Sequence, residues 1–384
     1  MTETKIKILF ISMPSIHFTR WIENLKDTPY ELFWFDVLTR GTFETEASVT
    51  QITGWKLEKR SHLSEEKTLK KYFPRVFAKL RSYAEVSVTE ALLKAIRELQ
   101  PDLVHSFEMQ HCSYPILKTM RKFPKLPWVY SCWGSDLYYY KQFPKHLTKI
   151  KKTLGRIDHL VTDNLRDHKI AKDLGFSGGF FGPIPGGGGY AISQYEALKK
   201  PPESRKKILI KGYEHTFGRG LHVVKTLAKI HTELQDYEVV VFGAHKSVID
   251  YINNEKLPFK VYNRHFLSHM ELIESMGKSL VYIGNSISDG IPNTLLEAMC
   301  MEVFPIQSNP GGVTEELITH GKNGLLISNV NSETELIDLT FTALKMVKEN
   351  RDYVDLNLQI ARERLDYEVN RTKILGVYKA ILKS

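Results

Sequence analysis

The chain contains 384 residues, 42% of them hydrophobic and 25% charged, and its formal net charge at pH 7 is +9. This length exceeds what one hydrophobic core usually supports, so two domains are expected, and the composition excludes a disordered or fibrous protein. No segment approaches the roughly 18 to 20 consecutive apolar residues of a membrane-spanning helix, and the positive charge favours anionic partners such as phosphate-bearing substrates or acidic lipid headgroups.

The cysteines and the basic runs bear on localisation. The three cysteines are an odd number and lie in no metal-binding spacing, which favours a reducing cytoplasm. The apolar run 8–11 is too short for a signal peptide and indicates a buried strand. Basic runs at 70–75, 141–152 and 205–207 leave two alternatives open: an ordinary solvated surface, or peripheral contact with the cytoplasmic face of an anionic membrane. No nucleic-acid-binding motif accompanies the charge, so nucleic acid is not an expected partner.

Short apolar strands alternate with helical patterns in the first half of the chain. Strands are expected at 7–12, 31–37, 103–105, 128–131 and 160–162. Helices are expected at 21–26 and over the long stretch 65–99. This alternation predicts a parallel sheet covered by helices on both faces.

A glycine-rich stretch at 175–189 follows, which no helix or strand interior should tolerate, and we place the domain boundary there. Beyond it, strands are expected at 207–211, 238–242, 260–262, 280–283 and 303–306. The expected fold class is therefore α/β, with two Rossmann-like domains, 1–185 and 186–362, facing across a cleft, followed by a helical segment at 363–384.

One segment combines two acids with a helix start, Asp289-Gly-Ile-Pro-Asn-Thr-Leu-Leu-Glu297. Pro292 suits the first turn of a helix, whose unpaired N–H groups can bind a pyrophosphate, and Gly290 allows close approach. Ligands of open α/β sheets bind at the carboxyl ends of the strands, where this loop must lie. Each acid can accept hydrogen bonds from a pair of sugar hydroxyls. A capping Asp289 and an exposed helical Glu297 are the alternative that the spacing leaves open.

The stretch 289–299, continued by 303–306, 309–317 and 320–327, closely resembles the donor-binding half of family 4 glycosyltransferases of the GT-B type. Further upstream, residues 211–220, 239–243 and 266–272 resemble the same family with less precision. The resemblance implies a GT-B fold whose C-terminal helix, 363–384, crosses back to an N-terminal acceptor-binding domain.

The resemblance also implies an activity. It implies a retaining, metal-independent glycosyltransferase of the hexosyltransferase type, with no cofactor besides its nucleotide-sugar co-substrate. The donor would be a nucleotide diphosphate sugar, with UDP-sugar favoured. The acceptor would be a hydroxyl of a glycan or a lipid-linked molecule in cell-envelope polysaccharide biosynthesis.

Carried over by position, the resemblance assigns roles to single residues. Glu297 would bind the ribose, and Asp289 would stand where the family usually has a Glu that touches the donor sugar. Arg219 would match a phosphate-binding Lys, and Lys211 would stand in for an Arg, so that both neutralise the departing diphosphate; surface charge beside a glycine turn is the alternative. The implied donor site comprises Lys211, Gly212, Arg219, Gly243, Arg264, His265, Gly290, Ile291, Pro292, Asn293, Thr294, Leu295 and Glu297.

The N-terminal half departs from the family pattern. The loop after the first strand lacks paired glycines, and its His17 and Arg20 are expected either to contact a ligand or to cap the next helix. His105, at a strand end, is either a sugar contact or a structural histidine. In Ser131-Cys-Trp-Gly-Ser-Asp136, Trp133 replaces the family's His. Asp136 then becomes a catalytic candidate beside Asp289 and Arg219, with a helix N-cap as its alternative.

Two other function classes stay open. No Asp-x-Asp metal motif lies at a strand end, so no metal is expected. A nucleotide-sugar epimerase, or a phosphorylase-like enzyme, could use the same double scaffold. A non-catalytic nucleotide-sugar-binding protein is the third alternative, motivated by Asp289 and Trp133. Slow hydrolysis of the donor would count against that third alternative.

Overall fold

The computed structural model describes residues 5–57, 72 and 85–382, and the chain divides into two compact units. Unit 1 comprises Met1–Thr162, Asp167–Gly182 and Lys373–Ser384, and unit 2 comprises Asp163–Arg166 and Pro183–Thr372. The chain leaves unit 1 after Gly182 and returns to it after Thr372, where the sequence suggested boundaries at 185 and 362.

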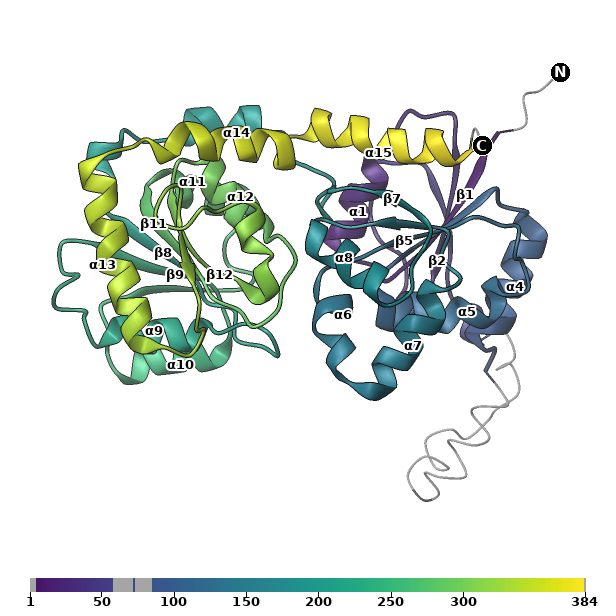
Figure 1. Cartoon of the computed structure of the whole chain (residues 1–384), viewed down its shortest axis with the longest axis horizontal. Helices are drawn as coiled ribbons and strands as arrows, with labels where there is room; N and C mark the ends of the chain where they lie inside the picture. The colour runs from purple at the N-terminus through teal and green to yellow at the C-terminus, as the bar shows by residue number, and fades with distance from the viewer. Residues whose placement is uncertain (1–4, 58–71, 73–84, 383–384) are drawn as a thin grey trace. The chain divides into compact units, whose positions relative to one another are not determined.

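Unit 1 is built on a seven-stranded parallel sheet with the strand order β3-β2-β1-β4-β5-β6-β7 (Figure 1). Its strands are β1 Lys7–Ser12, β2 Glu31–Asp36, β3 Val49–Ile52, β4 Leu103–Phe107, β5 Trp128–Ser131, β6 His159–Val161 and β7 Gly179–Phe181. Its helices are α1 Ile16–Glu23, α4 Val88–Leu99, α5 Tyr114–Met120, α6 Ser135–Tyr138, α7 Pro144–Leu154 and α8 Leu165–Asp173, with short helical turns η1 Trp55–Leu57, η2 Met109–Ser113 and η3 Tyr140–Gln142.

The two faces of this sheet are covered by different helices. Leu9 and Ile11 of β1 pack in one apolar core with buried residues of α4, α5, α7 and α8. Phe10 faces the other way, where its ring lies 5.9 Å from that of Phe18 in α1 and 6.2 Å from that of Tyr378. Tyr378 belongs to α15, Tyr367–Leu382, which begins in unit 2 and ends on unit 1. The C-terminal helix therefore crosses back to the N-terminal domain, as the sequence predicted.

Unit 2 contains a six-stranded parallel sheet with the order β10-β9-β8-β11-β12-β13. Its strands are β8 Lys207–Lys211, β9 Glu238–Ala244, β10 Lys260–Asn263, β11 Ser279–Gly284, β12 Phe304–Ser308 and β13 Leu325–Ile327. Its helices are α9 Gly220–Ala228, α10 Lys246–Asn254, α11 His269–Gly277, α12 Asn293–Cys300, α13 Glu333–Glu349 and α14 Tyr353–Leu365, with turns η4 Ile192–Leu198, η5 Pro202–Ser204, η6 Pro310–Gly312 and η7 Thr314–Glu316.

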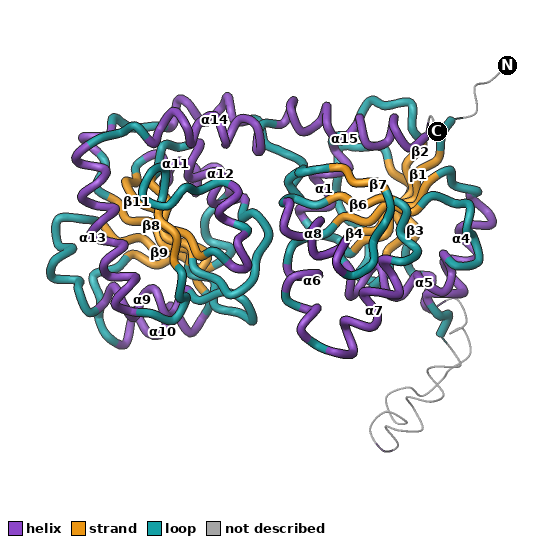
Figure 2. The backbone as a smooth tube through the Cα atoms, viewed as in Figure 1, coloured by secondary structure: helices purple, strands orange, loops and turns teal. Residues whose placement is uncertain are grey.

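Alternating side chains of β8 divide the core of unit 2. Ile208 and Ile210 pack with α9, α10 and α13. Leu209 points to the opposite face and packs with α11, α12 and α14. Figure 2 shows the strands of each unit enclosed by helices. Each unit is thus the doubly covered parallel sheet that the sequence predicted.

The structure corrects three expectations about elements, and it adds two strands, β3 and β13, that were not expected. The first helix begins earlier than expected, at Ile16, because the Ser15 hydroxyl accepts a hydrogen bond from Phe18 N at 3.2 Å and caps it. Of the helix expected over 65–99, α4 forms the last part, and most of the remainder lies outside the described residues. Among the described helices, none is long and apolar enough to cross a membrane.

The third correction concerns the glycine-rich stretch, where no strand was expected. It contains β7, which pairs with β6. The glycines permit this pairing, because a Cβ atom at Gly178 would lie 2.1 Å from Asp158 O and one at Gly179 would lie 2.6 Å from His159 Nδ1.

Candidate functional site

The loop between β11 and α12 is held in place by residues of a distant segment. Asp163 Oδ2 accepts a hydrogen bond from Ile291 N at 2.9 Å. Arg166 donates to Asp289 O at 2.9 Å and to Pro310 O at 2.6 Å, so it joins this loop to the loop after β12. A Cβ atom at Gly290 would lie 2.2 Å from Asp163 Oδ2, so any side chain there would displace the Asp163 carboxylate or the loop. Sequence reasoning missed Asp163 and Arg166 because they lie more than a hundred residues away in the chain.

α12 begins at Asn293, so the expected helix start is present, with Pro292 at the N-cap position and not in the first turn. The amides of Asn293 and Thr294 open the helix and have no intrahelical acceptor by geometry. Leu295 N, however, already donates to Pro292 O at 3.0 Å, so it is not available for a diphosphate in this conformation. The side chains of the first turn are also fixed, since Asn293 Nδ2 donates to Tyr190 OH at 3.2 Å and Thr294 Oγ1 lies 3.1 Å from Tyr282 OH.

An acid and an ammonium group meet at the carboxyl end of this sheet. Lys211 Nζ, at the end of β8, lies 3.8 Å from Asp289 Oδ2. Burial would lower the pKa of Lys211, but the negative charge of Asp289 and smaller contributions from nearby tyrosines outweigh it, so the pKa is raised. The raised pKa favours the charged form of Lys211 next to Asp289, which lies in the loop that precedes α12.

Tyr213 holds two predicted donor-site cations. Lys211 Nζ lies over the Tyr213 ring at 4.8 Å, and the guanidinium of Arg264 lies over the same ring at 5.4 Å. Gly243, with a φ of 62°, makes room for this ring, because a Cβ atom there would lie 2.3 Å from Tyr213 Cε1. His265, next to Arg264, is exposed and makes a backbone hydrogen bond to Asn263 Oδ1 at 2.9 Å.

The glycines around Arg219 bring two backbone segments together. A Cβ atom at Gly220 would lie 2.6 Å from the carbonyl carbon of Gly212. Arg219 occupies the N-cap position of α9, and its Nη1 donates to Gly218 O at 2.7 Å. The first turn of α9 is already occupied by a carboxylate, since Glu214 Oε2 accepts from Leu221 N at 2.9 Å. Glu214 was not singled out from the sequence.

Glu297 is buried inside the helix layer, with 2% of its surface exposed. Its Oε1 lies 2.8 Å from His269 Nε2, and the His269 ring is stacked on Tyr190 with centroids 5.0 Å apart. The alternative of an exposed helical Glu is thus contradicted, and so is a capping Asp289, because α12 has no side-chain cap. His269 lies in the segment 266–272, which resembles the glycosyltransferase family, but it was missed as a site residue. Its pairing with Glu297 is a tertiary contact, which the local sequence does not reveal.

Two of the candidate residues of unit 1, His17 and Arg20, lie in α1, and Trp133 lies in the loop between β5 and α6. Ser15 caps α1, so neither His17 nor Arg20 has the capping role considered for them. His17 is exposed, and its ring centroid lies 5.8 Å from that of Trp133. The indole N–H of Trp133 is buried without a hydrogen-bond partner among the described residues. His17 and Trp133 therefore form the pair in unit 1 that a ligand could contact.

His105 is a structural histidine. It is fully buried, with Nδ1 2.8 Å from Tyr378 OH and Nε2 2.8 Å from Ser131 Oγ. Burial lowers its pKa to about 3, so the ring is neutral. The expectation of a sugar contact is corrected, since both ring nitrogens are already engaged.

Asp136 is also occupied by the protein itself. It is 3% exposed and accepts hydrogen bonds from Met109 N at 3.1 Å, Trp133 N at 2.9 Å and the Tyr130 hydroxyl. Burial and the nearby charge of Glu108 raise its pKa to about 7. Asp136 does not cap α6, whose N-cap position is Gly134. In this conformation it organises the loop that carries Trp133 and does not face a ligand.

A strained residue at the end of β4 was not anticipated. Glu108 has a φ of 65° and a ψ of 141°, which is costly for any residue other than glycine. Its carboxylate accepts from Gln110 N at 2.9 Å and from His111 N at 2.5 Å, which stabilises the strained turn. Such strain is concentrated at functional sites. This turn contacts the loop that carries Trp133, because Met109 N donates to Asp136 Oδ2.

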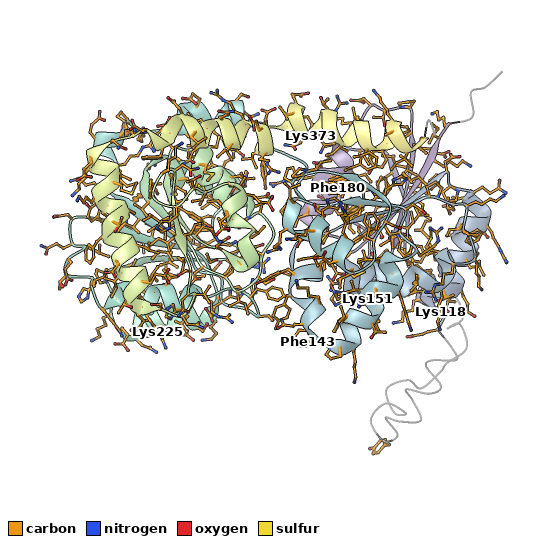
Figure 3. All side chains as sticks on the ribbon, viewed as in Figure 1. Lys118, Phe143, Lys151, Phe180, Lys225 and Lys373 are labelled. Atoms are coloured by element: carbon orange, nitrogen blue, oxygen red, sulfur yellow. The ribbon has the colours of Figure 1, made fainter. Side chains whose placement is uncertain are left out.

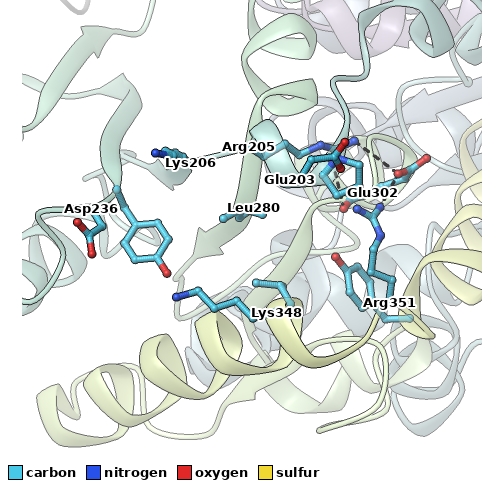
Figure 4. Close-up of a pocket in the computed structure, with 12 residues that line it drawn as sticks. Glu203, Arg205, Lys206, Asp236, Leu280, Glu302, Lys348 and Arg351 are labelled. Atoms are coloured by element: carbon cyan, nitrogen blue, oxygen red, sulfur yellow. Dashed lines mark hydrogen bonds and ion pairs between the residues drawn. The ribbon is translucent and has the colours of Figure 1, made fainter.

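A cavity of about 420 Å³ lies at the opposite, amino-terminal end of the unit 2 sheet (Figure 4). Glu302 is its central acid: its Oε2 lies 2.6 Å from Arg351 and 3.5 Å from Arg205, and its Oε1 lies 3.3 Å from Lys199. These charges are paired with one another, so we assign them to stability. In the part of the chain that the structure describes, no group of three or more histidines, cysteines or acids could hold a metal.

Comparisons with known proteins follow the same division into two halves. Residues 196–356 match the family described as glycosyl transferases group 1, and residues 7–164 match the family described as glycosyl transferase 4-like. No curated protein is significantly similar to the chain in sequence.

Solved structures with the same fold are distant in sequence. Anabaena HepE in complex with UDP has a TM-score of 0.67 at 13% identity, covering 98% of this chain and 100% of that one. Sucrose-phosphate synthase from Thermosynechococcus elongatus has a TM-score of 0.69 at 13% identity, covering 99% and 100%. A UDP-forming trehalose-phosphate synthase from Burkholderia xenovorans has a TM-score of 0.67 at 14% identity, covering 99% of each chain.

Proposed function

Because the chain belongs to the group 1 glycosyltransferases of the GT-B type, we propose that it transfers a sugar from a UDP-sugar to an acceptor hydroxyl with retention of configuration and without a metal. The acceptor that we propose is a glycan or a lipid-linked molecule used in cell-envelope polysaccharide biosynthesis. UDP is preferred to other nucleotides because HepE was solved with UDP, with UDP and glucose, and with UDP-glucose.

The observation that carries this proposal is the buried carboxylate of Glu297 in α12, the helix that follows the loop of Asp289, whose Oδ2 lies 3.8 Å from Lys211 Nζ. A carboxyl group in a buried position is costly unless it has strong hydrogen-bond partners. His269 provides one partner at 2.8 Å, and we assign the ribose hydroxyl pair of the donor as the other. The stacked rings of His269 and Tyr190 then offer a flat surface for the uracil base.

Lys211, Arg219 and the first amides of α12 are proposed to bind the diphosphate. In the reaction the bond between the anomeric carbon and the β-phosphate oxygen breaks, and negative charge grows on that phosphate. Preorganised cations and N–H groups stabilise the charge that develops on this phosphate in the transition state more than they stabilise the bound substrate, and this difference accelerates the reaction. Asp289, 36% exposed, is left to accept hydrogen bonds from the sugar.

The acceptor hydroxyl is proposed to attack the anomeric carbon from the side on which the phosphate leaves. Its proton passes to the departing phosphate oxygen, so UDP is released and the configuration is kept. No side chain needs to form a covalent intermediate. His17 and Trp133 are the residues of unit 1 proposed to contact the acceptor or the sugar.

We also propose that the reaction takes place in the cytoplasm, at the inner face of a membrane. The described cysteines are all unpaired and buried, which suits a reducing compartment. The basic runs of the sequence suit an anionic lipid surface.

A thermal-shift panel of UDP-, GDP-, ADP- and dTDP-sugars tests the donor, since a ligand that binds the native state raises the melting temperature. UDP-sugars should give the largest shift, and an unchanged transfer rate in EDTA should accompany it. No shift with any nucleotide sugar would refute the donor site. Conversion of the donor to an epimer without an acceptor would favour an epimerase, and binding without either transfer or hydrolysis would favour a non-catalytic protein.

A further inference from the structure

The positive charge of the chain is concentrated in one segment. Residues 109–157 contain ten lysines and arginines and a single acid, Asp136, so this segment alone carries a net charge of +9, equal to that of the whole chain. The rest of the chain is balanced, with 43 residues of each sign. A charge that is confined in this way indicates a surface for an anionic partner.

Eight of these cations lie on α5, on the segment that follows it and on α7, in unit 1. Arg156, just after α7, donates to Met120 O at 3.2 Å and to Phe123 O at 2.7 Å, which fixes the end of α7 beside the end of α5. The eight cations on these parts of the chain are exposed. We call them the basic face: Lys118, Arg121, Lys122, Lys125, Lys145, Lys149, Lys151 and Lys152. Within the described part of the chain, none of the eight has an ion-pair partner. Figure 3 shows Lys118 and Lys151 at the same edge of unit 1.

α7 separates its apolar and basic sides. Ile150 and Leu154 are buried against the core of unit 1. Lys145, Lys149 and Lys152 follow one another at helical spacing on the exposed side. Their long apolar stems can lie along the apolar surface of the helix while the ammonium groups reach phosphates.

Aromatic side chains stand at the beginning of α7. Phe143 is 40% exposed, and its ring lies 5.3 Å from Tyr139 and 6.3 Å from Tyr140. Tyrosine rings prefer the headgroup region of a bilayer, and phenylalanine rings enter the boundary between headgroups and acyl chains. The cluster follows α6, which directly continues the loop that carries Trp133, so Phe143 lies ten positions after Trp133 in the chain.

We propose that the basic face and Phe143 dock unit 1 on an anionic lipid surface, and that a lipid-linked acceptor reaches the Trp133 loop from that surface. The second half of this statement rests on the proposed function, whereas the docking does not. A lipid surface fits better than nucleic acid, because seven of the eight cations are lysines and because an exposed Phe beside them suits a bilayer interface.

Sedimentation of the full chain with vesicles tests the docking. The protein should bind vesicles of phosphatidylglycerol and phosphatidylcholine in equal parts and should not bind pure phosphatidylcholine. The triple variant Lys145→Gln, Lys149→Gln, Lys152→Gln should bind roughly 100-fold more weakly, at roughly fivefold for each cation. Phe143→Ser should also weaken binding, and what remains should keep its dependence on salt.

A matched variant separates position from total charge. Lys225→Gln, Lys256→Gln, Lys322→Gln removes the same charge from exposed positions of unit 2 and should bind vesicles like the unchanged protein. Equal loss in both triple variants, or tighter binding of the basic face to a DNA duplex than to vesicles, would overturn the proposal. UDP affinity, measured on the same proteins, separates the docking proposal from the proposed function. It should be the same in both triple variants, whether or not they bind vesicles.

Discussion

Replacing Glu297 by glutamine removes one negative charge from the core of unit 2 and keeps the size of the side chain. The carboxylate is 2% exposed, and one of its oxygens is 2.8 Å from His269 Nε2. Glutamine can still offer one oxygen, so the contact with His269 can persist and the fold should be retained. What the variant loses is the charged acceptor that we assign to the two ribose hydroxyls.

The size of this loss follows from the kind of bond removed. A hydrogen bond to a charged group contributes about 1.5 to 3 kcal/mol, and a neutral amide recovers only part of it. A deficit of about 1.4 to 2.8 kcal/mol corresponds to a dissociation constant for UDP that is roughly 10 to 100 times higher. The melting temperature without ligand should change little, because α12 keeps its packing.

Titration calorimetry with UDP measures this difference directly. Glu271→Gln is the matched control: it removes an acid from the exposed first turn of α11, two residues from His269, and should leave UDP affinity unchanged. If Glu297→Gln binds UDP as tightly as the unchanged protein while its melting curve shows a folded protein, the ribose assignment is wrong.

Three further predictions concern stability and loop geometry. Glu302→Ala should lower the free energy of unfolding by about 3 kcal/mol, because it leaves the buried Arg205 without its carboxylate partner; a denaturant titration that shows less than about 1 kcal/mol would contradict the structural role of that cluster. The pKa of Asp136 is raised to about 7, so the stability that its protonated form contributes is present below its unfolded-state pKa and is lost as the pH rises through 7. Asp136→Asn should therefore flatten the fall in melting temperature between the unfolded-state pKa and pH 7. The same dependence of melting temperature on pH in the variant and the unchanged protein would refute the raised pKa. Gly290→Ala should push the loop away from Asp163 and weaken UDP binding at least tenfold, whereas Gly376→Ala, where a Cβ atom meets nothing, should leave it unchanged.

The sequence was most informative where the chemistry is local. The start of α12 could be predicted because Pro292, the apolar face and the two acids lie within one short segment. Ten of the thirteen described strands and the crossing of the C-terminal helix were predicted for the same kind of reason, since each rests on short patterns or on a motif resemblance, whereas β3, β7 and β13 were not expected.

Burial and long-range pairing were not accessible in this way. His105 looked available at a strand end, but Tyr378, which lies 273 residues later, occupies one of its ring nitrogens. Asp136 was expected to face a sugar, yet its donors come from β5 and from the strained turn after β4. β7 was missed because its glycines were judged by flexibility, whereas their role is to let the strand lie close to β6.

The stereochemistry of transfer tests the central claim most directly. The UDP-sugar that raises the melting temperature most, with its sugar α-linked to UDP, should be incubated with the protein and with methanol in place of the natural acceptor. The methyl glycoside does not interconvert between anomers, so its configuration in an NMR spectrum records the chemical step. The proposed front-face reaction predicts the α-methyl glycoside, and formation of the β-methyl glycoside would contradict it.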